Sequence, residues 1–341
     1  MFNVRHSWVL LVAGCFMASC KSSDDTEEVG NWISRSSLEG VARGEAVSFV
    51  IGDKAYIGTG YDGTNRLKDF WYYNQTTNSW TQVADLPGAA RNSAVAFAVG
   101  TKGIVTTGYD GINKLNDTWV YDSQNDTWSA GAGFAGTARY GATAFAIGAK
   151  GYITCGYDGN YLKDFYSYDT SATGGAWTKE EAFGGNKRSD AVAFVINNKA
   201  YVVTGSNPNT GQTLSVNDMF MFDPASTAAN KWTEMRKISN VSDEDYDNDY
   251  DIVSSNGVAF VMNSKGYIAT GTKSGLTTNV WEYDPLTDTW ESKRAFEGLA
   301  RSGAVGFSIN NRGYVALGNS SSLPFEDLWE FDPAATYNEN D

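Results

Sequence analysis

The strongest constraint on this chain of 341 residues is an internal repeat that recurs six times. Each copy contains a phenylalanine followed eleven residues later by a glycine. The phenylalanines are Phe49, Phe97, Phe145, Phe194, Phe260 and Phe307, and the glycines are Gly60, Gly108, Gly156, Gly205, Gly271 and Gly318. A period of about 48 residues is typical of the blades of a β-propeller.

Further positions recur within each copy. Six residues before the phenylalanine lies an arginine in five copies, namely Arg43, Arg91, Arg139, Arg188 and Arg301, and Ser254 takes that place in the fifth. Later come an acidic or amide residue and two aromatic residues at alternate positions, as in Asp117-Trp119-Tyr121. A tryptophan then closes the unit, at Trp80, Trp128, Trp177, Trp232 and Trp290.

Each copy is predicted to form four strands. In the second copy these are AVAFAVG, GIVTTG, DTWVYD and TWSAGA, separated by turn residues. In the first of them Val95 and Phe97 face one way, and the small residues Ala94, Ala96 and Ala98 face the other, because side chains alternate along a strand. Large residues of one sheet can fit against small residues of the next where sheets converge on an axis. The pattern therefore predicts an all-β, six-bladed propeller.

The sixth copy ends at Phe331-Asp332-Pro333 and has no closing tryptophan. A tryptophan with the right spacing stands near the other end of the chain: Trp32 precedes Phe49 by 17 residues, as Trp80 precedes Phe97. We therefore expect an N-terminal strand around Trp32 to complete the last blade and close the ring.

The aromatic elements, the closing tryptophans and the glycine after the second strand resemble the kelch repeat. The resemblance covers residues 31–333 and looks like a bacterial branch of the family, with a distant likeness to the central domain of galactose oxidase and to N-acetylneuraminate epimerases. Kelch repeats usually carry two successive glycines. Here the first of the two is replaced, by Thr59, Thr107, Cys155, Thr204, Thr270 and Leu317.

The N-terminal segment is predicted to be a lipoprotein leader. Residues 1–19 carry Arg5 and His6 and then an apolar run too short for a membrane span. The segment ends in Met17-Ala18-Ser19-Cys20, which resembles a bacterial lipobox with Cys20 as the lipidated residue. An ordinary signal peptide with a chance cysteine is the alternative.

Residues 20–30 are expected to form a flexible acidic tether, which resembles the segment that directs some lipoproteins to the outer face of the outer membrane. The propeller is assigned to residues 31–333 and a C-terminal tail to 334–341. The expected location is the cell envelope, with attachment to the membrane only through the lipid.

Composition excludes several classes of function. A net charge of −14 disfavours nucleic acid, whose binding requires the neutralisation of phosphates. The only histidine is His6, so the chain after the leader lacks imidazole for most zinc, copper or iron sites and for Ser-His or Cys-His catalysis. After Cys15 and Cys20 only Cys155 remains, which leaves no partner for an intramolecular disulfide.

Two kinds of loop share one end of a propeller: those between second and third strands, and those between blades. Loops on a rigid scaffold commonly carry function. Two insertions, at residues 206–216 and 240–251, fall on this loop-rich face. If residues 243–251 are extended, five aspartates lie on one side and form a candidate calcium site: Asp243, Asp245, Asp247, Asp249 and Asp251. A solvated acidic loop without metal is the alternative, and no other cofactor is expected.

The loop-rich face also carries the candidate ligand-binding residues. Three blades share a triplet, Tyr61-Asp62-Gly63, Tyr109-Asp110-Gly111 and Tyr157-Asp158-Gly159. It either shapes the loop or forms an aromatic and acidic binding surface. The repeated arginines either pair with carboxylates inside the blade or, as in some kelch propellers, line a pocket for acidic ligands, in which case Arg91, Arg139 and Arg188 are the first candidates.

The function expected from these features is a surface-tethered, non-catalytic module that binds a glycan or a protein. The alternatives are an enzyme similar to sialic acid epimerases or mutarotases, and a structural subunit of an envelope complex. The resemblance to galactose oxidase does not extend to its copper chemistry, because that needs histidines. The oligomeric state is left open.

Overall fold

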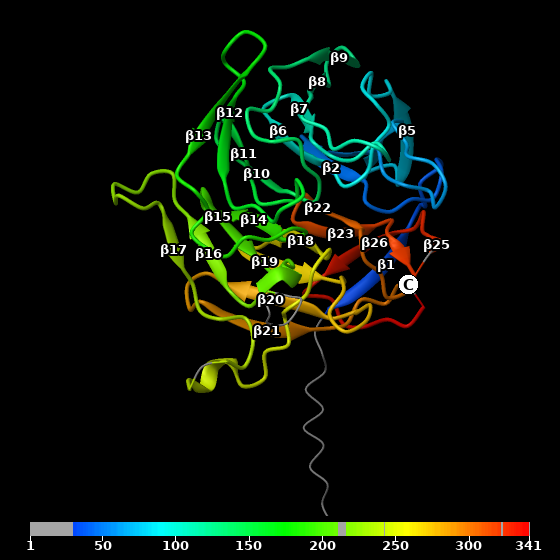
Figure 1. Ribbon diagram of the computed structural model, residues 1–341. Helices are drawn as coiled ribbons and strands as arrows, with labels where there is room; N and C mark the ends of the chain where they lie inside the picture. Colours follow the sequence, from blue (N-terminus) through cyan, green and yellow to red (C-terminus); the bar gives the residue numbers. More distant parts are fainter. Residues whose placement is uncertain (1–29, 211–215, 242, 322, 341) are drawn as a thin grey trace, which may run out of the picture.

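The protein is an all-β ring of six sheets, seen in a computed structural model that describes residues 30–210, 216–241, 243–321 and 323–340 (Figure 1). Within these residues there are six sheets of four antiparallel strands, one small hairpin and two short 3-10 helices. The predicted six-bladed propeller is confirmed. In the part of the chain that is described, no helix has the length and hydropathy of a membrane span.

The first three blades are continuous in sequence. Blade one contains β2 (Val47–Ile51), β3 (Lys54–Gly58), β4 (Phe70–Asn74) and β5 (Ser79–Val83). Blade two contains β6 (Val95–Val99), β7 (Lys102–Thr106), β8 (Thr118–Asp122) and β9 (Thr127–Ala130). Blade three contains β10 (Thr143–Ile147), β11 (Lys150–Thr154), β12 (Phe165–Asp169) and β13 (Ala176–Glu180).

The other three blades carry the irregular elements. Blade four contains β14 (Val192–Ile196), β15 (Lys199–Val203), η1 (Pro208–Thr210), β16 (Met219–Phe222) and β17 (Trp232–Glu234), and η2 (Asp245–Asp247) follows it. Blade five contains β18 (Val258–Met262), β19 (Lys265–Ala269), β20 (Val280–Asp284) and β21 (Thr289–Lys293). Blade six contains β22 (Val305–Ile309), β23 (Arg312–Ala316), the hairpin β24 (Asn319–Ser320) and β25 (Leu323–Pro324), and β26 (Leu328–Asp332).

The N-terminal strand β1 (Asn31–Arg35) completes blade six, as predicted. It pairs antiparallel with β26, with Trp32 opposite Phe331, and Figure 1 shows this blue strand beside the red C-terminal one. Trp32 is fully buried, stacks on Phe331 at 4.7 Å between ring centroids and meets Phe296 edge-on at 4.9 Å. Beyond the strands, the backbone N–H of Gly30 donates to the carbonyl of Ala335 at 3.1 Å.

The core lies between blades, where large side chains meet small ones. Phe49 of blade one belongs to a buried cluster against which Ala94, Ala96 and Ala98 of blade two pack, so the predicted size pattern is confirmed. A Cβ added at Gly103 of β7 would lie 2.3 Å from the Phe49 ring, and Gly151 stands in the same relation to Phe97. Each phenylalanine therefore fills a space that the next blade leaves open, which fixes the spacing of the ring.

Candidate functional site

The repeated arginines are buried inside the blades. Arg91 has no exposed surface, and its guanidinium group donates to both carboxylate oxygens of Asp117 at 2.6 and 2.7 Å and to the carbonyls of Ala89 and Thr107, both at 3.0 Å. Asp117 stands immediately before β8, and Arg43, Arg139 and Arg301 form the same bidentate pair in their own blades.

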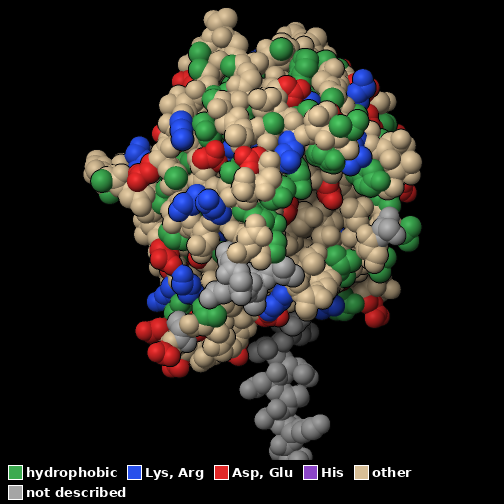
Figure 2. Space-filling view, viewed as in Figure 1, with side chains coloured by type: hydrophobic (Ala, Val, Ile, Leu, Met, Phe, Trp, Pro, Cys, Tyr) green, Lys and Arg blue, Asp and Glu red, His purple; other side chains and the backbone are tan. Residues whose placement is uncertain are grey.

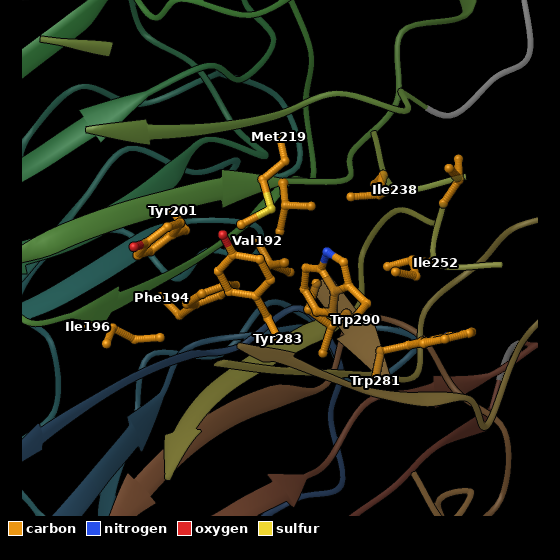
Figure 3. Close-up of a cluster of buried hydrophobic side chains, with 13 residues drawn as sticks. Val192, Phe194, Ile196, Tyr201, Met219, Ile238, Ile252, Trp281, Tyr283 and Trp290 are labelled. Atoms are coloured by element: carbon orange, nitrogen blue, oxygen red, sulfur yellow. The ribbon is translucent and has the colours of Figure 1, made fainter. Parts of the chain in front are cut away.

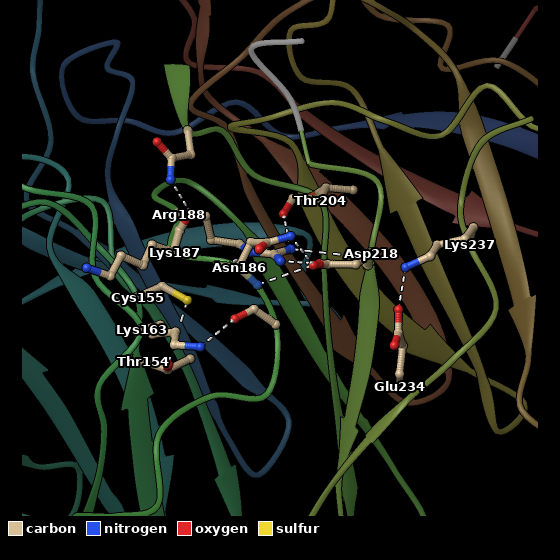
Figure 4. A network of polar contacts seen from close by, with 12 residues as sticks. Thr154, Cys155, Lys163, Asn186, Lys187, Arg188, Thr204, Asp218, Glu234 and Lys237 are labelled. Carbon is tan, nitrogen blue, oxygen red and sulfur yellow. Dashed lines mark hydrogen bonds and ion pairs between the residues drawn. The ribbon is translucent and has the colours of Figure 1, made fainter. Parts of the chain in front are cut away.

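The arginine of blade four follows the same plan. The Arg188 guanidinium group contacts Asp218, which also accepts from the side-chain amide of Asn186 (Figure 4). Ligand binding by Arg91, Arg139 and Arg188 stays a prediction, but all three are fully buried and their geometry favours the structural alternative.

The acidic insertion does not have the extended backbone that would place its five aspartates on one side. The 3-10 helix η2 forms over Asp245–Asp247, and the aspartates differ in their surroundings: Asp247 is buried, and Asp251 forms an ion pair with Lys273. Figure 2 shows acidic side chains gathered at the edge where η2 lies. Among the described residues no group of three or more metal-ligating side chains is close enough to hold an ion. Calcium binding at Asp243, Asp245, Asp247, Asp249 and Asp251 stays a prediction.

The aspartates of the three triplets shape their own loops. The Asp62 carboxylate accepts from the backbone N–H groups of Thr64 and Asn65 at 2.7 and 2.6 Å, and Asp110 repeats this with Ile112 and Asn113. These hydrogen bonds lower the pKa of both carboxyl groups. At Asp158 burial raises the pKa, but the bonds from Thr137 and Asn160 outweigh it and the net pKa is lowered.

The tyrosines of the triplets belong to a longer arc of rings across blades one to three. The Arg66 guanidinium lies between Tyr61 and Tyr109, 5.0 and 5.1 Å from their centroids. Tyr109 then meets Tyr140 at 5.7 Å, Tyr140 meets Tyr157 at 5.6 Å, and Tyr157 meets Tyr161 at 5.0 Å. The hydroxyls of Tyr61 and Tyr109 donate to the carbonyls of Gly63 and Gly111, both at 2.8 Å, which fixes these rings against their own loops.

A closed circle of backbone hydrogen bonds surrounds the mouth of the central channel. One residue from each blade, four positions before the repeated phenylalanine, donates its N–H to the carbonyl of its equivalent in the preceding blade at 2.7–3.0 Å. The six residues have φ of 50–62° and are Glu45, Ser93, Gly141, Asp190, Asn256 and Gly303. We call this set the mouth ring. It presents two carboxylates, Glu45 and Asp190, to the channel.

The two carboxylates of the mouth ring have different surroundings. Glu45 accepts from Ser93 Oγ at 2.5 Å and from the side-chain amide of Asn92. Asp190 accepts from Ser189 Oγ at 2.7 Å, but burial and the nearby charge of Glu45 raise the pKa of Asp190 to about 6. Asp190 is therefore a carboxyl group that changes charge close to neutral pH.

Residues of the mouth ring and of the arc of aromatic rings line one open cavity of about 440 Å³. Its wall includes the rings of Tyr109, Tyr140 and Tyr157, the two carboxylates, and Lys114, whose amine lies 5.8 Å from the centroid of Tyr157. Below the mouth ring the channel is lined by small residues of the first strands, such as Ala96, Ala144 and Ala193. The cavity is the candidate functional site.

Comparisons with known proteins agree with this architecture. The model of the Kelch motif matches residues 42–87, which span blade one. The chain is a six-bladed β-propeller with a Kelch motif in its first blade. A solved structure of the protein YjhT matches this kelch propeller with a TM-score of 0.69 at 16% identity, over 85% of this chain and 95% of that one. No curated protein matches the chain significantly.

Part of the site was predicted from the sequence of the kelch propeller. Tyr109 and Tyr157 line the cavity, and Tyr61 belongs to the same arc outside it. Sequence reasoning missed Glu45, Tyr140 and Asp190. For Glu45 and Asp190 a signal was present in the repeat. The position four before each phenylalanine holds Glu, Ser, Gly, Asp, Asn and Gly, and most of these residue types tolerate positive φ, which indicates a special turn there. Cys20 lies outside the described residues.

Proposed function

We propose that this kelch propeller is a non-catalytic binding module whose loop-rich face binds a glycan in the cavity over the mouth ring. The observation that carries the proposal is the meeting of three tyrosine rings with two carboxylates in one cavity of about 440 Å³. A volume of this size falls within the range of small-ligand sites.

Sugars fit the chemistry of this wall. The C–H faces of a sugar pack on aromatic rings, and its hydroxyls donate to carboxylates. Glu45 and Asp190 supply the acceptors, and Tyr140 and Tyr157 supply the rings. The overall negative charge favours a neutral glycan over a polyanionic one.

Apolar side chains on the same face support a protein as the other class of ligand. Most of the exposed large aliphatic side chains in the described chain belong to loops of this face: Val41, Ile112, Val241, Leu299 and Leu323. Exposed apolar surface commonly marks a contact with another protein. A structural role in an envelope complex would use this surface.

The test is a glycan screen with the purified protein, followed by titration of the best glycan against Tyr109→Ala, Tyr140→Ala and Tyr157→Ala. We expect each of these variants to weaken binding about tenfold, which is about 1.4 kcal/mol. Tyr337→Ala, in the C-terminal tail, is the control and should bind normally. Unchanged affinity in all three cavity variants would contradict the proposal.

An enzyme similar to sialic acid mutarotases or epimerases is the second candidate, and the raised pKa of Asp190 favours it. A carboxyl group with a pKa of about 6 suits proton transfer near neutral pH. The proton spectrum of N-acetylneuraminate would show faster exchange between anomers, and Asp190→Asn would abolish the acceleration. Binding without turnover would instead support the module.

We further infer that Cys20 carries a lipid that tethers the propeller to the outer membrane. The support is the lipobox-like sequence before Cys20 and the acidic segment after it. Labelling with a radioactive fatty acid tests this inference: wild-type protein should incorporate the label, and Cys20→Ser should not.

A further inference from the structure

Among the described residues, blade five has no counterpart of the buried ion pair of the other blades, and a cavity of about 260 Å³ lies in its place. Ser254 stands where the other blades have the arginine, and Asn279 stands where they have the aspartate. Both residues line the cavity, and so do the Lys273–Thr277 loop between β19 and β20 and the end of the acidic insertion. Because blade five has neither the arginine nor the aspartate, it has space at this position and no buried charge without a partner.

Trp281, a residue of the cavity wall, carries a buried polar group that lacks the partner its equivalents have. The indole N–H groups of Trp71, Trp119 and Trp329 donate to the aspartate of their own blade at 2.7–2.8 Å. Trp281 is the equivalent residue of blade five. It is only 8% exposed, and its Nε1 has no hydrogen-bond partner among the residues that the structure describes. A buried donor without an acceptor is costly, so an acceptor supplied by a ligand would be favourable there.

The cavity wall combines apolar and polar side chains. Ile252, Val253, Ile268 and the Trp281 ring contribute apolar surface, and Figure 3 shows Ile252 and Trp281 in the cluster between blades four and five. Ser254, Thr277 and Asn279 contribute hydroxyl and amide groups. At the rim Lys273 and Asp251 pair with each other, so their charges offset.

We propose that the blade-five cavity binds one neutral sugar residue, as a second subsite separate from the cavity over the mouth ring. Each sugar hydroxyl both donates and accepts, which suits a wall that offers an unpaired indole N–H beside hydroxyl and amide groups. The apolar residues of the wall can pack against the C–H face of a sugar ring. The acidic insertion disfavours an anionic sugar. The proposal does not depend on the first cavity.

The indole resonance of Trp281 tests this directly. In ¹H–¹⁵N spectra of the full-length protein, Trp281→Phe identifies the Trp281 indole peak by its absence. Glucose, galactose and N-acetylglucosamine are then added singly to about 10 mM, tenfold above a millimolar Kd. We expect at least one sugar to move the peak downfield and to saturate it. The same shift should appear in Tyr109→Ala, which alters only the first cavity.

A filled cavity is the decisive control. Ser254→Arg combined with Asn279→Asp rebuilds the pair of the other blades. This double variant should keep or raise the melting temperature and lose the shift at the Trp281 peak; if it does not fold, Ser254→Met fills the same space. A Trp281 peak that no sugar moves, or that moves equally in the filled variant, would overturn the proposal. If Tyr109→Ala weakens glycan binding but keeps the sugar-induced shift of the Trp281 peak, the two sites are separate, as proposed.

Discussion

At the scale of single residues, the buried arginines compensate for a strained turn. The residues that replace the first glycine of the kelch pair have φ between 59° and 63°: Thr59, Thr107, Cys155, Thr204, Thr270 and Leu317. Such a conformation costs a residue with a side chain about 1–3 kcal/mol. In every blade except the fifth, the carbonyl of this residue accepts from the guanidinium group of the arginine at 2.9–3.2 Å. The arginine thus stabilises the turn through this carbonyl and fixes the third strand through the aspartate that precedes it.

Arg188→Met is expected to destabilise the fold by about 3–5 kcal/mol, because it leaves Asp218 buried without its partner. Denaturant unfolding measures the change. The double variant Arg188→Met with Asp218→Leu should recover most of the loss. If the double variant is as unstable as the single one, the cost lies in the lost turn contacts and not in the unpaired charge.

The raised pKa of Asp190 predicts a pH dependence of stability. The carboxyl group is neutral in both the folded and unfolded chain below its ordinary pKa of 3.8, so it costs nothing there. As the pH rises from 3.8 to about 6, the unfolded state gains more from ionisation, and stability falls. Asp190→Asn should therefore stabilise the protein at pH 8 by up to about 3 kcal/mol and leave it unchanged near pH 3.5. Equal effects at both pH values would contradict the prediction.

At the scale of elements, β1 is the strand on which closure depends. It joins residues some 300 positions apart in sequence, and its Trp32 fills the space between Phe331 of its own blade and Phe296 at the boundary with blade five. Phe260 of blade five also meets Trp32 edge-on at 6.4 Å. The two chain ends are therefore held by one aromatic cluster.

Trp32→Ala is expected to cost about 3–5 kcal/mol, the usual cost of removing a fully buried large aromatic side chain. Thermal unfolding and limited proteolysis after residue 333 would measure it. Trp177→Ala is the control, because Trp177 closes blade three but is only partly buried and joins no chain end. Equal destabilisation by the two variants would show that β1 has no special role in closure.

The elements were easier to predict than the site for a physical reason. Blade strands repeat because each phenylalanine needs a small residue such as Gly103 or Gly151 in the next blade, so packing imposes the same pattern six times. The site depends on where blades differ. Glu45 and Asp190 hold equivalent positions in blades one and four, and only the closed circle brings them to one mouth. The conformation of η2 also escaped prediction, because alternation of aspartates does not determine the backbone of a loop.

At the scale of the whole molecule, the junction between the first and last blades resembles the junctions between consecutive blades. Blades one and six are neighbours through β2 and β22, as consecutive blades are elsewhere, and the circle of backbone hydrogen bonds at the mouth ring continues across that junction. The closed ring therefore depends little on where along the sequence the chain begins and ends.

A circular permutant should fold. A short glycine linker would join residue 335 to residue 30, whose backbones already share a hydrogen bond, and new ends would open at the exposed tip between β12 and β13, near Thr173. We expect a melting temperature within about 5 °C of the original, since all blade strands stay intact and only the contacts of the C-terminal tail, such as those of Asn338 with Asn31 and of Tyr337 with Arg294, are removed. Opening the chain instead between Ile104 and Val105, both fully buried in β7, should abolish folding. Failure of the first permutant would contradict the interchangeability of the blades.

The direction of β1 determines from which end of the propeller the N-terminal segment leaves. Every fourth strand runs toward the loop-rich face, and β1 takes the place of a fourth strand, so Asn31 lies at the opposite end of the ring. A lipid at Cys20 would thus hold the propeller by its underside. The cavity over the mouth ring and the blade-five cavity would then both open away from the bilayer.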